Sequence, residues 1–173
     1  MSTQPEVWLR GPVPGIDPRL QPPAHAFLQA REDVEGVLAE LSADEIWQAP
    51  GGAASVGFHV VHMVGSTERL LTYARGESLS EAQRARLSAE RTPGRVEAAS
   101  LVGALRAGID AALVQLAQTQ PGILQEARTV GRAALPTTVL GLLFHAAEHA
   151  QRHAGQIITT AKVVRLPASE KGA

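Results

Sequence analysis

Five of the six histidines in this 173-residue chain stand in two short stretches, His59 and His62 in one and His145, His149 and His153 in the other. The second group is spaced i, i+4 and i+8, so on a helix each step advances about 400° and the three side chains drift by only about 80°. Neighbouring imidazoles on such a face lie within about 5–6 Å at Cβ and can converge on one ion. A third imidazole from another helix would give three neutral nitrogen ligands with open positions, which suits divalent Zn, Ni, Fe or Mn.

Each of these residues also has a simpler interpretation. A single helical histidine is more often hydrogen-bonded or half-exposed than a ligand, which is our interpretation of His25, and His59 fits a core or a rim position equally well. A His-x3-His pair occurs by chance on solvated faces, although imidazoles that face an Ala- and Leu-rich interior each need a partner. Glu68 and Glu148 are interpreted as solvated helix charges. Glu148 becomes a candidate catalytic residue only if it faces the histidines, where it could orient a ligand or accept a proton from bound water.

Helices are the elements that must position these side chains. The 45% hydrophobic content is dominated by Ala, Leu and Val, and only six residues are aromatic, which favours an all-α fold over a sheet. Apolar residues at three- and four-residue steps predict four helices. We expect them near residues 22–41, 55–74, 100–118 and 136–164, with Ser55 as the cap of the second and Pro136-Thr137-Thr138 opening the fourth.

The segments between and around these helices are also informative. The polar segment 76–99 predicts a short helix near 80–89 and a break at Thr92-Pro93-Gly94, and its length permits a crossover along a helix bundle. After Pro121-Gly122 the chain is expected to be irregular or partly helical as far as Ala134.

Six prolines within the first twenty-three residues predict an extended N-terminal arm over residues 1–21. Its Trp8 and Leu9 are expected to dock on the body of the protein or on a second copy. The helical body is then predicted to span residues 22–166, closed by Pro167, with a C-terminal tail at 167–173.

Charge and composition narrow the class of protein. Sixteen Lys and Arg residues against seventeen Asp and Glu give a net charge of −1, which offers no support for nucleic-acid binding. Cysteine is absent, which excludes disulfides, thiolate metal sites and a cysteine nucleophile. The N-terminal residues lack the pattern of a secretory signal, and no run of about eighteen uninterrupted apolar residues is present. We therefore expect a cytoplasmic protein with no membrane partner.

Two motifs resemble the DinB/YfiT-like superfamily. Residues 55–63, SVGFHVVHM, are similar to its helix-two signature, in which a small-aromatic-His-x-x-His stretch supplies one metal ligand. Residues 145–157, HAAEHAQRHAGQI, are similar to its final helix, with two ligand histidines four apart followed by Gly-Gln-Ile. The order and spacing of the helices also fit over about residues 24–164. The resemblance implies a four-helix bundle with a long connection between helices two and three, a divalent metal held by His62, His149 and His153, and commonly a homodimer.

The resemblance also suggests an activity. Members with known activity use the metal to activate a low-molecular-weight thiol or water, as thiol S-transferases, a mycothiol-dependent isomerase or proposed hydrolases, while many members have no known activity. It implies a metal-dependent enzyme acting on a small molecule, with a low-molecular-weight thiol as co-substrate in the transferase case. His145, outside the implied ligands, is expected beside His149, where it could position a substrate or shuttle a proton. The alternative is a non-catalytic helical bundle that serves in stress response or interaction, with a structural or vestigial metal site.

Overall fold

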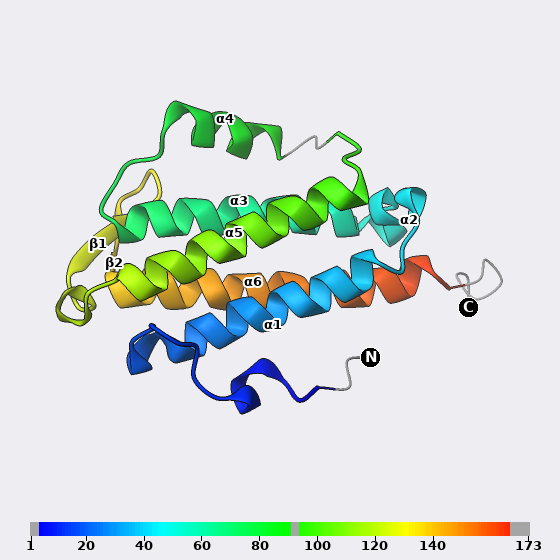
Figure 1. Cartoon of the computed structure of the whole chain (residues 1–173). Helices are drawn as coiled ribbons and strands as arrows, with labels where there is room; N and C mark the ends of the chain where they lie inside the picture. The colour runs from blue at the N-terminus through cyan, green and yellow to red at the C-terminus, as the bar shows by residue number, and fades with distance from the viewer. Residues whose placement is uncertain (1–3, 91–93, 167–173) are drawn as a thin grey trace.

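The computed structural model describes residues 4–90 and 94–166 (Figure 1). Within them, four long helices lie side by side: α6 packs against α1 and α3, and α5 packs against the same two helices. Their apolar faces meet in one core, at which Phe27, Met63, Leu105 and Leu143 are almost completely buried. The bounds of the four helices are α1 (Gln21–Leu38), α3 (Val56–Ala74), α5 (Ala98–Gln118) and α6 (Val139–Val164).

The described chain is mostly helical, which confirms the predicted fold class in its main part. Each predicted helix overlaps one long helix, with ends that differ by up to three residues. The cap predicted at the start of α3 is present, because the Ser55 hydroxyl accepts a hydrogen bond from the Phe58 amide. At the start of α6 the Thr138 hydroxyl accepts from the Gly141 amide in the same way. These caps fix where the two helices that carry the paired histidines begin.

A small hairpin precedes α6. The prediction of irregular or partly helical chain as far as Ala134 holds for the 3-10 turn η4 (Pro121–Ile123) and for the turn at 131–134, and it was wrong for the first strand of the hairpin. Strands β1 (Ala127–Val130) and β2 (Leu135–Thr138) pair antiparallel, with Ala127 opposite Thr138. The turn between them contains Gly131 at φ 73° and Ala134 at φ 48°. Pro136 was expected to open the helix, but a proline is also tolerated in an edge strand, and both strands of this hairpin are edges. The helix therefore begins three residues later than predicted.

The connection between α3 and α5 runs back along the outside of α3, as the predicted crossover does (Figure 1). It contains helix α4 (Glu81–Ala89), close to the predicted short helix, and Ser80 and Gln83 form a capping box at its start. The predicted break at Thr92-Pro93 lies outside the described residues, as does the predicted C-terminal tail, residues 167–173.

Sequence reasoning missed one short helix, α2 (Ala43–Trp47), between α1 and α3. Its signal was a capping box, in which the Ser42 hydroxyl accepts from the Glu45 amide and the Glu45 carboxylate accepts from the Ser42 amide. The Trp47 ring lies against Gly57 of α3, where an added Cβ would come within 2.8 Å of it. The glycine therefore lets α2 pack directly on the helix that carries His59 and His62.

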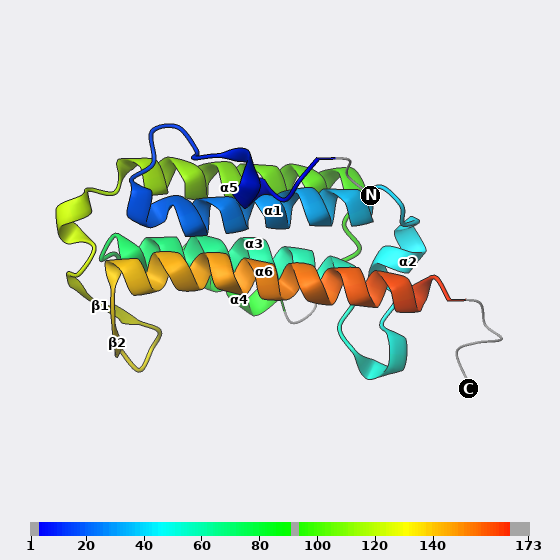
Figure 2. The same ribbon diagram turned by 90° about the horizontal axis from the view of Figure 1, so that it is seen from below.

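The N-terminal segment lies along α1 (Figure 2). Where an extended arm was predicted, it contains two 3-10 turns, η1 (Val7–Arg10) and η2 (Pro18–Leu20). Trp8 and Leu9, which were expected to dock on the body or on a second copy, do not dock on the body, because they are 60% and 56% exposed, and docking on a second copy stays a prediction. Val7 is buried in their place.

Helix α5 is long and apolar enough to cross a membrane by length and composition alone, a test that core helices of soluble proteins also pass. In this structure its buried residues include Leu105 and Leu116. Arg106 of α5 pairs with Glu35 of α1 at 2.9 Å, and Asp110 of α5 accepts a hydrogen bond from Arg31 of α1 at 2.8 Å. The apolar stripe and the charges of α5 thus both have partners within the fold.

Candidate metal centre

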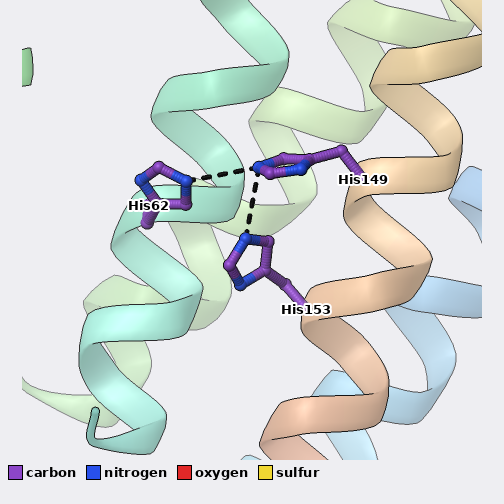
Figure 3. Close-up of side chains that lie close together, drawn as sticks. All are labelled: His62, His149 and His153. Carbon is purple, nitrogen blue, oxygen red and sulfur yellow. Dashed lines mark hydrogen bonds between the residues drawn. The ribbon is translucent and has the colours of Figure 1, made fainter.

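Three histidine rings meet between α3 and α6 (Figure 3). His62 projects from α3, and His149 and His153 project from successive turns of α6. The Nε2 atom of His149 lies 3.2 Å from Nε2 of His62 and 3.2 Å from Nε2 of His153. Among the described residues, these three form a group whose ligand atoms all lie within 4.8 Å of one another. The structure therefore brings together the three histidines that the resemblance implied as ligands.

The distances between these nitrogens fit coordination of one cation. Two imidazole nitrogens bound to a zinc ion at about 2.0–2.1 Å with tetrahedral geometry lie about 3.3–3.4 Å apart. The observed contacts of 3.2 Å are close to this value. The third pair, His62 and His153, lies within 4.8 Å, so the three rings are close enough to share one ion.

Two of the three rings also make a hydrogen bond through Nδ1, the nitrogen that does not face the cluster. Nδ1 of His62 lies 2.9 Å from a carboxylate oxygen of Glu90, at the end of α4. Nδ1 of His153 lies 3.0 Å from Nδ1 of His59, one turn before His62 on α3. Nδ1 of His149 is buried and has no hydrogen-bond partner among the described residues. A carboxylate thus orients His62, and another imidazole contacts His153.

Proton positions at the cluster favour a cation. A carboxylate can only accept, so the proton of a neutral His62 lies on Nδ1 and its Nε2 presents a lone pair. His149 has at most one proton on Nε2, which cannot point at both of its neighbours. The contacts of His149 with His62 and with His153 therefore cannot both be good hydrogen bonds without a cation. A divalent cation, by contrast, accepts the lone pairs of all three nitrogens.

Burial also favours the neutral form of His149 and His153, which is the form that binds metals. Burial first, and then the proximity of the other imidazoles, lower the pKa of His153 to about 4. Burial is also the largest cause that holds the pKa of His149 and of His59 below the ordinary histidine value, with His62 as the next. Protons therefore compete weakly for His149 and His153 at neutral pH.

The ring of Phe58 covers one side of the site. It stacks on His62 with the centroids 5.8 Å apart and the planes within 5° of parallel, and it meets His59 edge-on at 5.7 Å. His62 itself stays partly accessible, with 26% of its side chain exposed. The cluster is thus partly shielded from water and reachable from the surface.

The two candidate catalytic residues lie beside the cluster on the exposed side of α6. The ring of His145 is 5.6 Å from that of His149, as the helical spacing predicted. Its Nδ1 lies 3.2 Å from the carboxylate of Glu148, which also pairs with Arg152 at 2.5 Å. Neither belongs to the group of convergent nitrogens. Their catalytic roles remain predictions.

Four other residues, two outside the site and two beside it, differ in how well the sequence predicted them. His25 contacts the Gly11 carbonyl at 3.0 Å, and Glu68 pairs with Arg86, both in keeping with their structural interpretations. His59 and Glu90 are the residues that sequence reasoning did not assign to the site. His59 had a signal in its three-residue spacing from His62. Glu90 had none, because it is 28 positions away from His62 in a polar connection.

Fold and site together define a mostly helical protein with a three-histidine candidate metal centre at the contact of two helices. The DinB superfamily matches residues 26–157, a range that covers most of the chain and contains all three convergent histidines. The chain therefore belongs to the DinB superfamily. A search of curated proteins gives no match.

Proposed function

We propose that this protein is a DinB-type four-helix bundle that binds a divalent cation through His62, His149 and His153 and acts as a metal-dependent enzyme on a small molecule. The reaction class is thiol S-transfer or hydrolysis. The observation that carries the proposal is the convergence of three Nε2 atoms from two helices, with 3.2 Å contacts that match the spacing of ligands on one ion.

The donor set supports a catalytic site over a closed structural one. Structural zinc sites have four protein ligands, whereas catalytic sites have three and leave a position for water or substrate. The described residues offer three such ligands here. A bound divalent cation supplies Lewis acidity, which lowers the pKa of a thiol or water and makes it nucleophilic at neutral pH. Zn, Ni, Fe and Mn are all compatible with imidazole donors.

The chain's own residues supply the remaining requirements. Glu90 and His59 hold the rings of His62 and His153 in place through their Nδ1 atoms. Phe58 excludes water from one side of His62. His145 stands at the exposed edge of the cluster, where its imidazole can accept a proton from a substrate or contact it directly.

Metal content tests this proposal directly. Protein purified without an affinity tag and loaded with Zn²⁺ should retain about one ion per chain after gel filtration, and His149→Ala should retain essentially none. His25→Ala is the matched control, because it removes a histidine that lies outside the convergent group and hydrogen-bonds the Gly11 carbonyl. Equal zinc in wild type and His149→Ala would reject the site. The zinc-loaded protein is then screened for conjugation of low-molecular-weight thiols to a model electrophile, and zinc binding without turnover would favour the non-catalytic alternative.

A further inference from the structure

A buried carboxylate joins the crossover connection to the candidate metal centre. Glu90 stands at the C-terminal end of α4 and is only 6% exposed. Its Oε2 atom lies 2.9 Å from Nδ1 of His62 and also accepts a hydrogen bond from Nη2 of Arg69 at 3.3 Å, while its Oε1 atom accepts one from Nη1 of Arg69 at 2.5 Å. Arg69 is itself buried, with 10% of its side chain exposed. A buried charge pair of this kind is costly to assemble unless both groups are well hydrogen-bonded, as they are here.

The sequence of α3 leaves room for this arrangement. An added Cβ at Gly65 would overlap the Oε1 atom of Glu90 and would lie 2.8 Å from Nη1 of Arg69. Gly65 is in the middle of α3, where glycine is an unfavourable choice for a helix. The absence of a side chain at this position lets the carboxylate reach the helix surface beside His62.

The contacts of Glu90 with Arg69 and with His62 have separate consequences. Arg69 holds both oxygens of the carboxylate and fixes its orientation. Oε2 is also the acceptor that faces His62, so the proton of a neutral His62 ring is held on Nδ1 and the lone pair of Nε2 is directed at His149. In this geometry the tautomer that a metal requires is set by a residue of the connection.

We propose that Glu90 is a positioning residue of the metal centre: it fixes His62 in the Nδ1-protonated tautomer, with Arg69 and Gly65 as its supports. This inference rests on the proposed metal site. It assigns to the crossover a role in the site, since without Glu90 the ring of His62 would keep its backbone position and lose the group that orients it.

Glu90→Gln tests the inference with little change in volume. A glutamine has one acceptor oxygen, which buried Arg69 needs, so the NH₂ group of the glutamine is left facing Nδ1 of His62. Because this NH₂ group can only donate, Nδ1 of His62 must accept, and the proton of the ring moves to Nε2, the atom that would bind the metal. Glu90→Gln should weaken Zn²⁺ affinity, measured by competition with a chromophoric chelator, by about 10- to 100-fold.

Glu68→Gln is the matched control. Glu68 of α3 pairs with Arg86 of α4, so its carboxylate also links these two helices. It is 45% exposed, however, and lies outside the contacts of His62. Its Zn²⁺ affinity should stay within about twofold of wild type, since exposed ion pairs contribute little. Glu90→Gln and Glu68→Gln binding zinc equally tightly, with His149→Ala deficient, would overturn the role of Glu90 and leave the metal site standing.

A second measurement uses the metal-free protein, and its result for the wild type does not depend on any variant folding. Long-range ¹H–¹⁵N NMR spectra of the histidine rings distinguish Nδ1–H from Nε2–H tautomers. Wild type should show His62 protonated on Nδ1, and Glu90→Gln should show it protonated on Nε2. An Nε2-protonated His62 in the wild type would overturn the inference, whatever the metal affinity. Absence of zinc binding in the wild type would instead reject the proposed function and, with it, the metal-directed role of Glu90.

Discussion

Two interfaces between helices, called here the α1–α5 seam and the α3–α6 seam, differ in the kind of polar residue that they contain. Between α1 and α5 the polar contacts are ion pairs at the surface, Arg106 with Glu35 and Arg31 with Asp110. Between α3 and α6 they are imidazoles, and His59 and His153 are only 7% and 8% exposed. In an exposed ion pair each charge already has its partner, and the pair contributes little to the stability of the fold. Buried imidazoles whose nitrogens face one another need a proton or a cation between them, which is why we place the proposed metal site between α3 and α6.

The largest predicted effect comes from making the α3–α6 seam apolar. The double variant His59→Leu, His153→Leu removes both partners of one buried contact, and such paired replacements are nearly neutral or stabilising. Zinc binding should fall below detection in equilibrium dialysis. The Tm of the metal-free protein should stay within about 5 °C of wild type or rise. A large fall in Tm would show that the histidines of this seam serve stability.

Metal addition should stabilise the protein through the same seam. At a free Zn²⁺ concentration of about 100 times Kd, linkage predicts about 2.7 kcal/mol, which for a chain of this size raises Tm by roughly 5–11 °C. Differential scanning calorimetry measures the shift, and excess chelator should reverse it. His149→Ala is the control and should show no shift. A similar rise in that variant would place the zinc elsewhere.

A smaller effect is expected at the exposed edge of the seam. His145→Ala should retain its zinc, because His145 does not belong to the convergent group, while any thiol-transfer or hydrolytic turnover should fall by about tenfold or more. Elemental analysis and steady-state rates of the same preparation separate the two roles. Loss of zinc to the extent seen in His149→Ala would make His145 a ligand, and the ligand set would need revision.

The smallest effect belongs to the α1–α5 seam. A hydrogen bond from Arg106 is the largest cause that holds the pKa of Glu35 below its ordinary value. The pair therefore contributes stability at neutral pH that is lost as pH falls through the range where Glu35 is protonated. Arg106→Ala should lower Tm by about 2 °C or less at pH 7, with a smaller difference at pH 3 and in high salt, and should leave zinc binding unchanged. An equal deficit at all pH values would remove the ion pair as its cause.

The same comparison shows what the sequence could reveal. His149 and His153 were accessible to prediction because a helix turns their four-residue spacing into a shared face, and His62 because it stands in a motif similar to that of a known family. The helices were predictable for the same reason, since their apolar periodicity is local. Only the packing of α3 on α6 could show that the three rings meet.

Features that depend on contacts distant in sequence were missed. Glu90 reaches His62 from a polar connection in which no periodicity marks a buried residue. The hairpin at β1 and β2 has strands of four residues each, too short for an alternating pattern to outweigh the proline at position 136. At the N-terminus, the larger Trp8 was expected to dock, but the backbone turn of η1 buries Val7 and leaves Trp8 exposed.

The ligands of a bound metal can be observed directly. X-ray absorption spectroscopy at the zinc edge, on wild type loaded with one equivalent of Zn²⁺, should show a nitrogen shell near 2.0–2.1 Å with the scattering pattern of three imidazoles. A shell of oxygen atoms without imidazole scattering would mean that zinc binds to surface carboxylates, and it would contradict the assignment of His62, His149 and His153 as the metal centre.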